Sequence, residues 1–396
     1  MKIQFNKPYK TGKELLYIED AIERGKISGN GHYTQECHSF FEKRYGFRKC
    51  LLTTSCTDAL EMAAILLDIT PGDEVIMPAY TFVSTANAFV LRGATIVFCD
   101  SRSDHPNMNE ELIEGLITAK TKAIVAVHYA GMACKMDAIM EIADRHGLFV
   151  VEDAAQAVDS YFVDSEGQKH PLGGIGHLGA FSFHETKNII CGEGGMLVVN
   201  DERFEKRSEI IWEKGTNRTA FFRGEVDKYG WVDIGSSFLM SELNAAFLLA
   251  QLENLDEILQ KRRHIWETYD DFFASEFTAF LRPNVPDWAT NNGHMYYLVC
   301  ESLEKRTLAL DALKSVGVGA VFHYQNLSSS KMGGGFNQAQ LDQAERYTNC
   351  LFRLPLFPEL DAEKVFLKLK NGLLIEKTGS CKLENNDNSR TGKPID

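Results

Sequence analysis

The chain has 396 residues, of which 44% are apolar and 24% charged, the balance of an ordinary globular protein rather than of a disordered or fibrous one. Because one domain usually takes about 100 to 200 residues, we expect a large domain with a smaller companion. The formal net charge of -13 argues against nucleic acid or an anionic membrane as a partner, although a few backbone N–H groups suffice to hold a small anion.

Short β-branched runs recur between residues 50 and 200. They fall at 74–77, 95–98, 123–127, 148–151, 180–183 and 196–199. Helical patterns at 109–119 and 136–146 lie between several of them. This alternation predicts an α/β fold in which helices cover a mostly parallel sheet.

The second half of the chain has fewer predicted strands. From residue 241 to about 273, apolar residues at three- and four-residue spacing predict a connecting helix. We therefore place a large domain at 1–250 and a small C-terminal domain at 251–375. A glycine- and serine-rich stretch at 328–335 predicts a mobile loop, and the polar, aperiodic residues 376–396 predict a disordered tail.

The cysteines and the apolar runs bear on the compartment. Nine scattered cysteines with no C-x-x-C pair favour reduced thiols. No apolar stretch approaches the roughly 18 residues of a membrane span, and residues 1–10 lack the apolar core of a signal peptide. We expect a soluble cytoplasmic protein, and no metal, because the histidines show no metal-ligand spacing.

Polar groups follow buried strands or open helices in three segments, 52–60, 150–156 and 181–188. Ligands usually sit at the carboxyl ends of parallel strands, so we look for chemistry there. An acid, a lysine and a hydroxyl-rich helix start in one pocket are what imine chemistry on a phosphorylated pyridine requires.

Lys187 is the candidate amine, since it comes just past a buried strand and before the small-residue turn 192–195. A lysine attacks an aldehyde only when its pKa is lowered enough to leave a neutral fraction. The alternative is a solvated surface lysine. Asp153 ends a hydrophobic strand and would keep a pyridine nitrogen protonated; its alternative is a helix cap or a structural ion pair.

Residues 53–57 predict a phosphate site where a loop feeds a helix. One alternative is that these residues only cap the helix. Another is that Cys56 is a nucleophile, because a helix start lowers the pKa of a thiol; no histidine or acid is placed by the sequence to support this role. The G-x-G-x-x-G match at 174–179 follows a polar loop and runs into a strand, so we interpret it as a loop rather than a dinucleotide site.

These segments resemble the DegT/DnrJ/EryC1/StrS family of pyridoxal-phosphate (PLP) sugar aminotransferases over about residues 3–370, most specifically at 152–156 and 182–188. The resemblance implies the aspartate-aminotransferase fold (fold type I), with a large domain of mostly parallel sheet and a smaller C-terminal α+β domain. It also implies PLP as the cofactor and a homodimer whose active sites are shared between subunits.

The resemblance assigns cofactor roles to single residues. It makes Lys187 the Schiff-base lysine and Asp153 the partner of the pyridine nitrogen, with Gln156 near the ring's phenolic oxygen. The phosphate ligands it implies are Cys56, Thr57 and Ser182. Phe82 falls where the family stacks an aromatic side chain on the cofactor, and its alternative is ordinary core packing.

The reaction implied is transfer of the amino group of L-glutamate to C4 of a nucleotide-linked (dTDP) 4-keto-6-deoxy sugar, with Arg218, His323 and Tyr324 near the sugar nucleotide. The chain departs from many relatives at Gln325–Ser330, where they have a second histidine, and at Ser237, where they have an asparagine that reaches the partner's phosphate. The alternatives are a C3-aminating transaminase, a sugar dehydratase, whose relatives carry histidine at the place of Lys187, and a non-catalytic PLP-binding protein.

Overall fold

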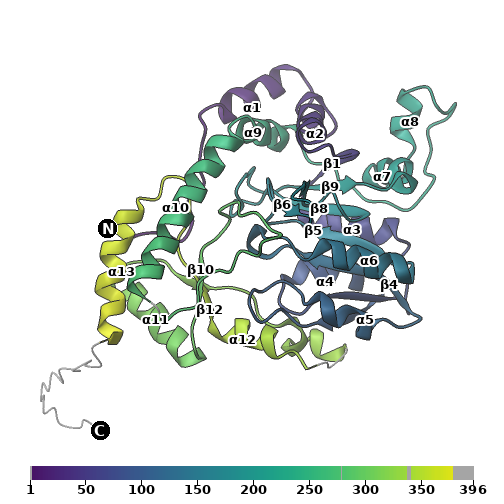
Figure 1. The fold of residues 1–396 in the computed structure, drawn as a ribbon. Coiled ribbons are helices and arrows are strands. Elements are labelled where there is room, and N and C mark those ends of the chain that lie inside the picture. Colours follow the sequence, from purple (N-terminus) through teal and green to yellow (C-terminus); the bar gives the residue numbers. More distant parts are fainter. Residues whose placement is uncertain (1, 278, 337–339, 378–396) are drawn as a thin grey trace, which may run out of the picture.

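A seven-stranded sheet forms the centre of the computed structural model, which describes residues 2–277, 279–336 and 340–377 (Figure 1). Its strands are β1 (Lys49–Thr53), β2 (Glu74–Pro78), β3 (Thr95–Cys99), β4 (Thr121–Val127), β5 (Phe149–Asp153), β8 (Leu178–Ser182) and β9 (Gly195–Val199). They lie in the order β1-β9-β8-β5-β4-β2-β3, and only β9 runs antiparallel to its neighbours. All of the predicted strands belong to this sheet, which confirms the α/β class; β1 was not predicted.

Helices cover both faces of the sheet, and each face has its own apolar core. One core includes α3 (Cys56–Leu66), α4 (Val83–Val90) and α7 (Glu205–Trp212). The other includes α2 (His32–Tyr45), α5 (Ile113–Leu116), α6 (Met136–His146) and α9 (Glu242–Leu252). Val151 of β5 packs into the first core and its neighbour Val150 into the second. Because both faces are buried, the strands are continuous apolar runs.

The helix predicted at 136–146 is α6, with the same ends. The helix predicted at 109–119 is wrong in length, since only the 3-10 turn Glu110–Leu112 and the single turn of α5 form before Ile117 becomes extended. Gly115 and the β-branched Ile117 and Thr118 disfavour a longer helix.

The connecting helix predicted from residue 241 is two helices, α9 and α10 (Leu255–Glu276). The chain leaves helical geometry at Asn254, whose side-chain amide donates to the carbonyl of Ala250 at 2.9 Å. α1 (Glu14–Glu23) packs against α9, so the beginning and the middle of the chain lie side by side (Figure 1).

A second, three-stranded antiparallel sheet lies in the C-terminal part of the chain. Its strands are β10 (Tyr297–Val299), β12 (Leu351–Arg353) and β11 (Val321–Phe322), in that order. Its helices are α11 (Leu303–Ser315), α12 (Asp342–Cys350) and α13 (Ala362–Lys377). The N-terminal segment joins this part, since Ile3 forms a parallel bridge with Val318.

Asp100, which follows β3, ties the two parts together. Its carboxylate accepts the N–H groups of Gln343 at 3.0 Å and Ala344 at 2.8 Å in the first turn of α12. The segment at 328–335, predicted as a mobile loop, overlaps the 3-10 turns Leu327–Ser329 and Gly333–Gly335. The Ser330 hydroxyl links the two turns, because it donates to the carbonyl of Leu327 and accepts the N–H of Gly333. The predicted tail lies outside the described residues apart from its first two, which end α13.

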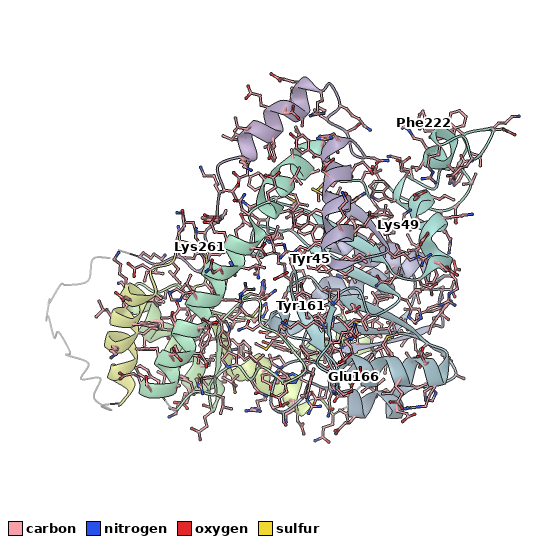
Figure 2. All side chains as sticks on the ribbon, turned by 45° about the horizontal axis from the view of Figure 1, so that its top comes forward. Tyr45, Lys49, Tyr161, Glu166, Phe222 and Lys261 are labelled. Atoms are coloured by element: carbon pink, nitrogen blue, oxygen red, sulfur yellow. The ribbon has the colours of Figure 1, made fainter. Side chains whose placement is uncertain are left out.

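Two smaller elements lie outside these two sheets. The hairpin β6 (Tyr161–Val163) with β7 (Lys169–Pro171) is one, and the other is α8 (Arg218–Phe222), which projects beyond the main sheet (Figure 1). Figure 2 shows Phe222 on this projecting part. Within the described ranges, the cysteines are free, no acidic, histidine or cysteine cluster could hold a metal ion, and no helix has the length and apolar composition to cross a bilayer.

Candidate active site

A cavity of about 570 Å³ lies where three parallel strands end. Val127, Asp153 and Ser182, the last residues of β4, β5 and β8, all line it. The predicted site residues that line it are Cys56, Thr57, Phe82, Asp153, Gln156, Ser182, Lys187, His323 and Tyr324. The carboxyl edge of the sheet therefore brings together side chains that are up to 268 residues apart in the sequence.

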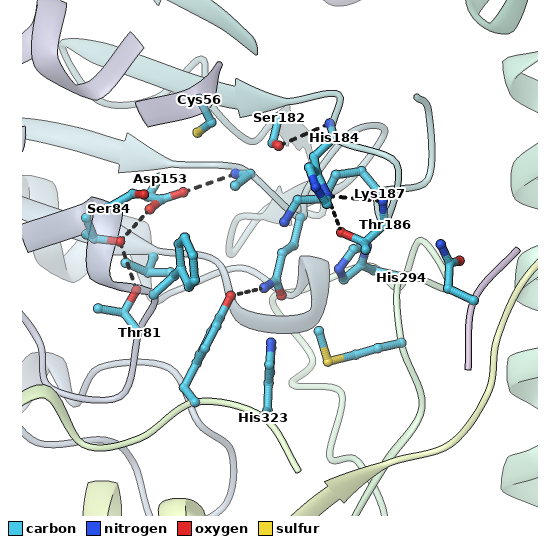
Figure 3. Close-up of a pocket in the computed structure, with 18 of the residues that line it drawn as sticks. Cys56, Thr81, Ser84, Asp153, Ser182, His184, Thr186, Lys187, His294 and His323 are labelled. Carbon is cyan, nitrogen blue, oxygen red and sulfur yellow. Dashed lines mark hydrogen bonds between the residues drawn. The ribbon is translucent and has the colours of Figure 1, made fainter. Parts of the chain in front are cut away.

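Asp153 is a buried carboxyl group at one side of the cavity (Figure 3). It accepts the hydroxyl of Thr85 at 2.8 Å and the backbone N–H of Ala155 at 3.2 Å. Burial raises its pKa, while these two hydrogen bonds and the Lys187 cation oppose the rise. The carboxyl group caps no helix and forms no ion pair among the described residues, so it is available to a cationic ligand.

Lys187 reaches into the same cavity from the loop that follows β8 (Figure 3). Its backbone N–H donates to the carbonyl of His184 at 2.9 Å, which closes a tight turn. Burial lowers the pKa of its amine, and the positive charge of Arg353 lowers it further against the opposing effects of Cys56 and Asp153. Burial therefore shifts this amine in the direction that a nucleophile needs, and the surface-lysine alternative is wrong because the side chain lines the cavity.

The start of α3 forms one end of the cavity. Ser55 caps the helix by accepting the N–H of Asp58 at 3.1 Å, which leaves Cys56 and Thr57 in the first turn at the cavity wall. A Cβ on Gly195 would lie 2.3–2.4 Å from Ser55 and Cys56 backbone atoms, so only glycine allows this approach. The positive end of a helix with hydroxyl groups around it suits a phosphate.

Cys56 does not have the properties of a nucleophile. Burial raises the pKa of its thiol well above the ordinary value, and the nearby Asp153 carboxylate acts in the same direction. The helix start therefore does not produce the thiolate that the nucleophile alternative required.

Gln156 connects the cavity to buried backbone. Its amide oxygen accepts the N–H of Ala130 at 2.6 Å, and its amide nitrogen donates to the hydroxyl of Tyr324 at 2.8 Å. Ala130 has a left-handed φ of 58°, which is unfavourable for a residue with a Cβ. Such strain is concentrated at functional sites in proteins.

His323 stacks on the ring of Tyr324 with centroids 3.6 Å apart, and its Nδ1 is hydrogen-bonded to the Tyr129 hydroxyl at 2.7 Å. Burial lowers the pKa of His323 well below its ordinary value. Phe82 is 55% exposed at the cavity wall, so the core-packing alternative for it is wrong. The side chains of His323 and Phe82 are thus available to a ligand.

Residues 174–177 of the glycine-rich match form a loop, as predicted, and its last two residues, Leu178 and Gly179, begin β8. The Glu152 carboxylate accepts the N–H groups of Gly173, Ile175 and Gly176 at 2.6–2.8 Å, and His128 lies 2.9 Å from it. Glu152, next to Asp153 in sequence, therefore points away from the cavity and fixes the loop before β8.

Three basic side chains from the C-terminal part of the chain also line the cavity, and none of them was predicted from the sequence. Arg262 of α10 is 2% exposed and donates to the carbonyls of Gly293 at 3.1 Å and His294 at 2.7 Å. His294 is hydrogen-bonded through Nδ1 to Asn188 at 2.8 Å, and burial lowers its pKa well below the ordinary value. Arg353 ends β12. No local pattern marks any of the three, because they come from separate elements of the C-terminal part.

Arg218 is the one predicted site residue that the fold does not bring to this cavity. It lies on α8, with its guanidinium 5.3 Å from the ring centroid of Phe222. Its predicted role in binding substrate stays a prediction.

The chain has the fold of PLP-dependent transferases of fold type I. It is similar to the solved structures of the aminotransferase TlmJ from Streptoalloteichus hindustanus (27% identity, TM-score 0.86, covering 95% of this chain and 100% of that one) and the putative sugar aminotransferase Spr1654 from Streptococcus pneumoniae in its PMP form (26% identity, TM-score 0.87, 96% and 98%). It is also 32% identical over 363 residues to the spore coat polysaccharide biosynthesis protein SpsC of Bacillus subtilis (strain 168), covering 89% of this chain and 92% of that protein.

The model of the DegT/DnrJ/EryC1/StrS aminotransferase family matches residues 8–367, and the chain belongs to this family. PLP is the cofactor, and the cavity fits it in three respects: Lys187 offers a poorly solvated amine, Asp153 a carboxyl group with no ion-pair partner among the described residues, and α3 a helix start whose first-turn residues line the cavity.

Proposed function

We propose that this protein transfers the amino group of L-glutamate to C4 of a dTDP-linked 4-keto-6-deoxy sugar, giving dTDP-4-amino-4,6-dideoxygalactose for a surface polysaccharide. The observation that carries transamination is that Lys187 and Asp153 enter one cavity beside the start of α3.

The sugar substrate rests on the family and on two relatives, SpsC and Spr1654, whose names state polysaccharide biosynthesis and sugar amino transfer. Residues 214–228 and 233–243 further resemble the dTDP-4-amino-4,6-dideoxygalactose transaminase of enterobacterial common antigen synthesis. This resemblance is our reason for choosing C4 and the galactose epimer.

Bound PLP supplies an electron-poor ring that stabilises the negative charge left when a proton leaves a substrate carbon. In our proposal Lys187 holds the cofactor and, once freed, carries that proton as general base and then general acid. Asp153 holds a proton on the pyridine nitrogen, and Gln156 lies near the phenolic oxygen.

The remaining cavity residues bind and orient. Cys56, Thr57 and Ser182 hold the cofactor phosphate, and Phe82 covers one face of the ring. His323 and Tyr324, whose ring centroid lies 6.1 Å from that of Phe82, contact the sugar nucleotide. Because Tyr324 is already held by Gln156, its hydroxyl is fixed before substrate arrives.

The test is incubation of the purified protein with L-glutamate, PLP and a panel of nucleotide-linked keto-sugars, with the products identified by mass spectrometry and their regiochemistry by NMR. We expect one added amino group at C4 of the dTDP-linked 4-keto-6-deoxy sugar. Amination at C3, or turnover only with another nucleotide, contradicts the proposed substrate but not the transamination.

Borohydride reduction followed by peptide mapping tests the cofactor lysine separately. We expect the label on Lys187 and its loss in Lys187→Ala, whereas Lys261→Ala, on the outer face of α10, serves as the matched control because its partners Glu257 and Tyr9 lie outside the cavity. A label on another lysine, or full turnover by Lys187→Ala, refutes the assignment.

Two other functions remain as alternatives. A sugar dehydratase of the same fold would give a deoxy-sugar instead of an amino-sugar, and the presence of Lys187 rather than histidine argues against it. A non-catalytic PLP-binding protein would show no change of cofactor absorbance with glutamate, and the unpaired Asp153 argues against it.

We also propose a homodimer with shared active sites. Phe222, on the part that projects from the sheet (Figure 2), is 72% exposed, and Trp231, nine residues further along the chain, is 84% exposed; a subunit interface would cover these rings. A dimer would also give Arg218 a route to the partner subunit's cavity. Sedimentation equilibrium tests this, and a monomer at working concentrations would refute it.

A further inference from the structure

Two threonine hydroxyl groups form a chain of hydrogen bonds that ends at the Asp153 carboxylate (Figure 3). The Thr85 hydroxyl donates to Asp153 Oδ2 at 2.8 Å, and Thr81 Oγ1 lies 2.9 Å from Thr85 Oγ1. Thr85 is 0% and Thr81 2% exposed, so both groups are shielded from water. Among the described residues, Thr81 Oγ1 has no hydrogen-bond partner other than Thr85.

The number of hydrogens fixes the direction of this chain of bonds. A carboxylate only accepts hydrogen bonds, and a threonine hydroxyl has a single hydrogen to donate. When Asp153 is ionised, Thr85 must therefore donate its hydrogen to Asp153 and accept that of Thr81. The Ala155 N–H donates to the other carboxylate oxygen at 3.2 Å. Every donor in this group is thus directed at the negative charge.

These donors take the place of water around a buried charge. Burial raises the pKa of Asp153, and the Thr85 hydroxyl is the largest of the contributions that oppose the rise. Hydrogen bonds to an ionised group are about twice as strong as neutral ones, and each member of a chain polarises the next. Without the hydroxyl groups, a proton shared between Asp153 and a pyridine nitrogen would move towards the carboxylate and leave the ring neutral.

One short segment carries both hydroxyl groups. Thr81 comes directly before Phe82, the N-cap residue of α4, and Thr85 lies in the first turn of this helix, where its N–H donates to the carbonyl of Phe82 at 3.1 Å. The helix start therefore sets where the two hydroxyl groups lie. The same segment supplies the aromatic side chain that we assign to the face of the cofactor ring.

We propose that Thr81 and Thr85 are positioning residues that keep Asp153 ionised, so that the proton it shares with the cofactor stays on the pyridine nitrogen. This rests on the proposed role of Asp153 and adds to it the groups that determine how electron-poor the bound ring is. Both threonines act through Asp153 rather than on the substrate.

The first test uses the cofactor-free protein and needs no turnover. Thr85→Val keeps the shape of the side chain and removes the hydroxyl, so the pKa of Asp153 should rise further above its ordinary value. The variant should therefore lose most stability at neutral pH, where Asp153 is ionised in the wild type, and less at acid pH, where the carboxyl group is protonated in both proteins. Urea unfolding from neutral to acid pH measures this difference, and an equal loss at every pH overturns the inference.

The second test measures the protonation of the ring, which the NMR shift of the nitrogen in isotope-labelled PLP reports. We expect a protonated nitrogen in the wild type and a shift towards the neutral form in Thr85→Val. The glutamate half-reaction should slow on the order of 10-fold, because one hydrogen bond to the carboxylate is lost while the carboxylate remains. Thr85→Ser, which keeps the hydroxyl, should restore both measurements, and Thr81→Val should have the smaller effect of removing the second donor.

Thr34→Val is the matched control, because the Thr34 hydroxyl also donates to a buried carboxylate, that of Glu242, and neither residue lines the cavity. It should lose stability and leave both cofactor measurements unchanged. Thr81→Val should change neither measurement further in the Thr85→Val background, because the chain of bonds is already broken. Additive effects of the two substitutions overturn the inference.

Asp153→Asn separates this inference from the proposed function. A ring nitrogen that is still protonated in Asp153→Asn refutes the proposed role of Asp153 itself. A nitrogen that is neutral in Asp153→Asn but as protonated in Thr85→Val as in the wild type overturns only the role of the threonines.

Discussion

Replacing Gly195 by alanine should damage cofactor binding without touching a side chain of the site. The new Cβ would lie 2.3 Å from the carbonyl carbon of Ser55 and 2.4 Å from the nitrogen of Cys56, whereas ordinary contacts begin at about 3.4 Å. These neighbours are backbone atoms, so β9 and the start of α3 must separate by about 1 Å. Overpacking of this kind costs about 1–3 kcal/mol of stability.

The same displacement moves the N–H groups that we assign to the cofactor phosphate. Losing one hydrogen bond to a charged group costs about 1.5–3 kcal/mol, or roughly 10- to 150-fold in affinity. Titration of the cofactor-free protein with PLP and its urea unfolding measure the two effects. Gly115→Ala is the control, since a Cβ there meets nothing within 4 Å. Wild-type affinity and stability in Gly195→Ala would refute the phosphate site at α3.

Three further substitutions test the buried charges. Lys187→Met should stabilise the cofactor-free protein at neutral pH, because burial lowers the pKa of the Lys187 amine below 10.5. The unfolded wild-type chain therefore binds more protons than the folded one, and the stability of the wild type rises with pH towards 10.5. The advantage of the variant in urea unfolding should therefore shrink over that range, and a growing advantage contradicts this. Asp153→Asn should keep the Lys187 label but lower turnover on the order of 100-fold or more, because the charge opposite the pyridine nitrogen is gone; near-normal turnover would exclude that role. Glu152→Gln should cost about 1–3 kcal/mol in urea unfolding, because an amide cannot accept all the N–H groups that the carboxylate accepts, and unchanged stability would speak against this network.

The sheet was predictable from sequence because its strands are buried on both faces and therefore form long apolar runs. α6 was predictable because Met136, Ile139 and Ala143 repeat at helical spacing. The strands of the small sheet, β10 to β12, are two or three residues long, too short to show a period. The sequence therefore predicted the seven-stranded sheet better than the three-stranded one.

The same limit applies to the cavity. Asp153 was found because parallel strands end at one edge, so residues at strand ends meet there, whereas Ser182 was assigned through the family resemblance. Arg262, His294 and Arg353 come from α10, a loop and the end of β12, the central strand of the second sheet, and only the packing of the C-terminal part against the main sheet brings them to the cavity. No rule based on neighbouring residues could have selected them.

Buried side-chain amides determine which atoms at the cavity are hydrogen-bond donors and which are acceptors. The Ala130 N–H holds the oxygen of Gln156, so the amide nitrogen faces Tyr324, whose own hydrogen is left to point at a ligand. On the other wall, the side-chain nitrogen of Asn188 donates to the Asn292 carbonyl, so the side-chain oxygen of Asn188 faces His294 Nδ1. That oxygen can only accept, so Nδ1 carries the hydrogen and Nε2 of His294 keeps a lone pair. The cavity therefore offers a hydrogen-bond donor, the Tyr324 hydroxyl, on one side and an acceptor, His294 Nε2, on the other. A substrate bound the other way round would face donor with donor and acceptor with acceptor, and neither hydrogen bond could form.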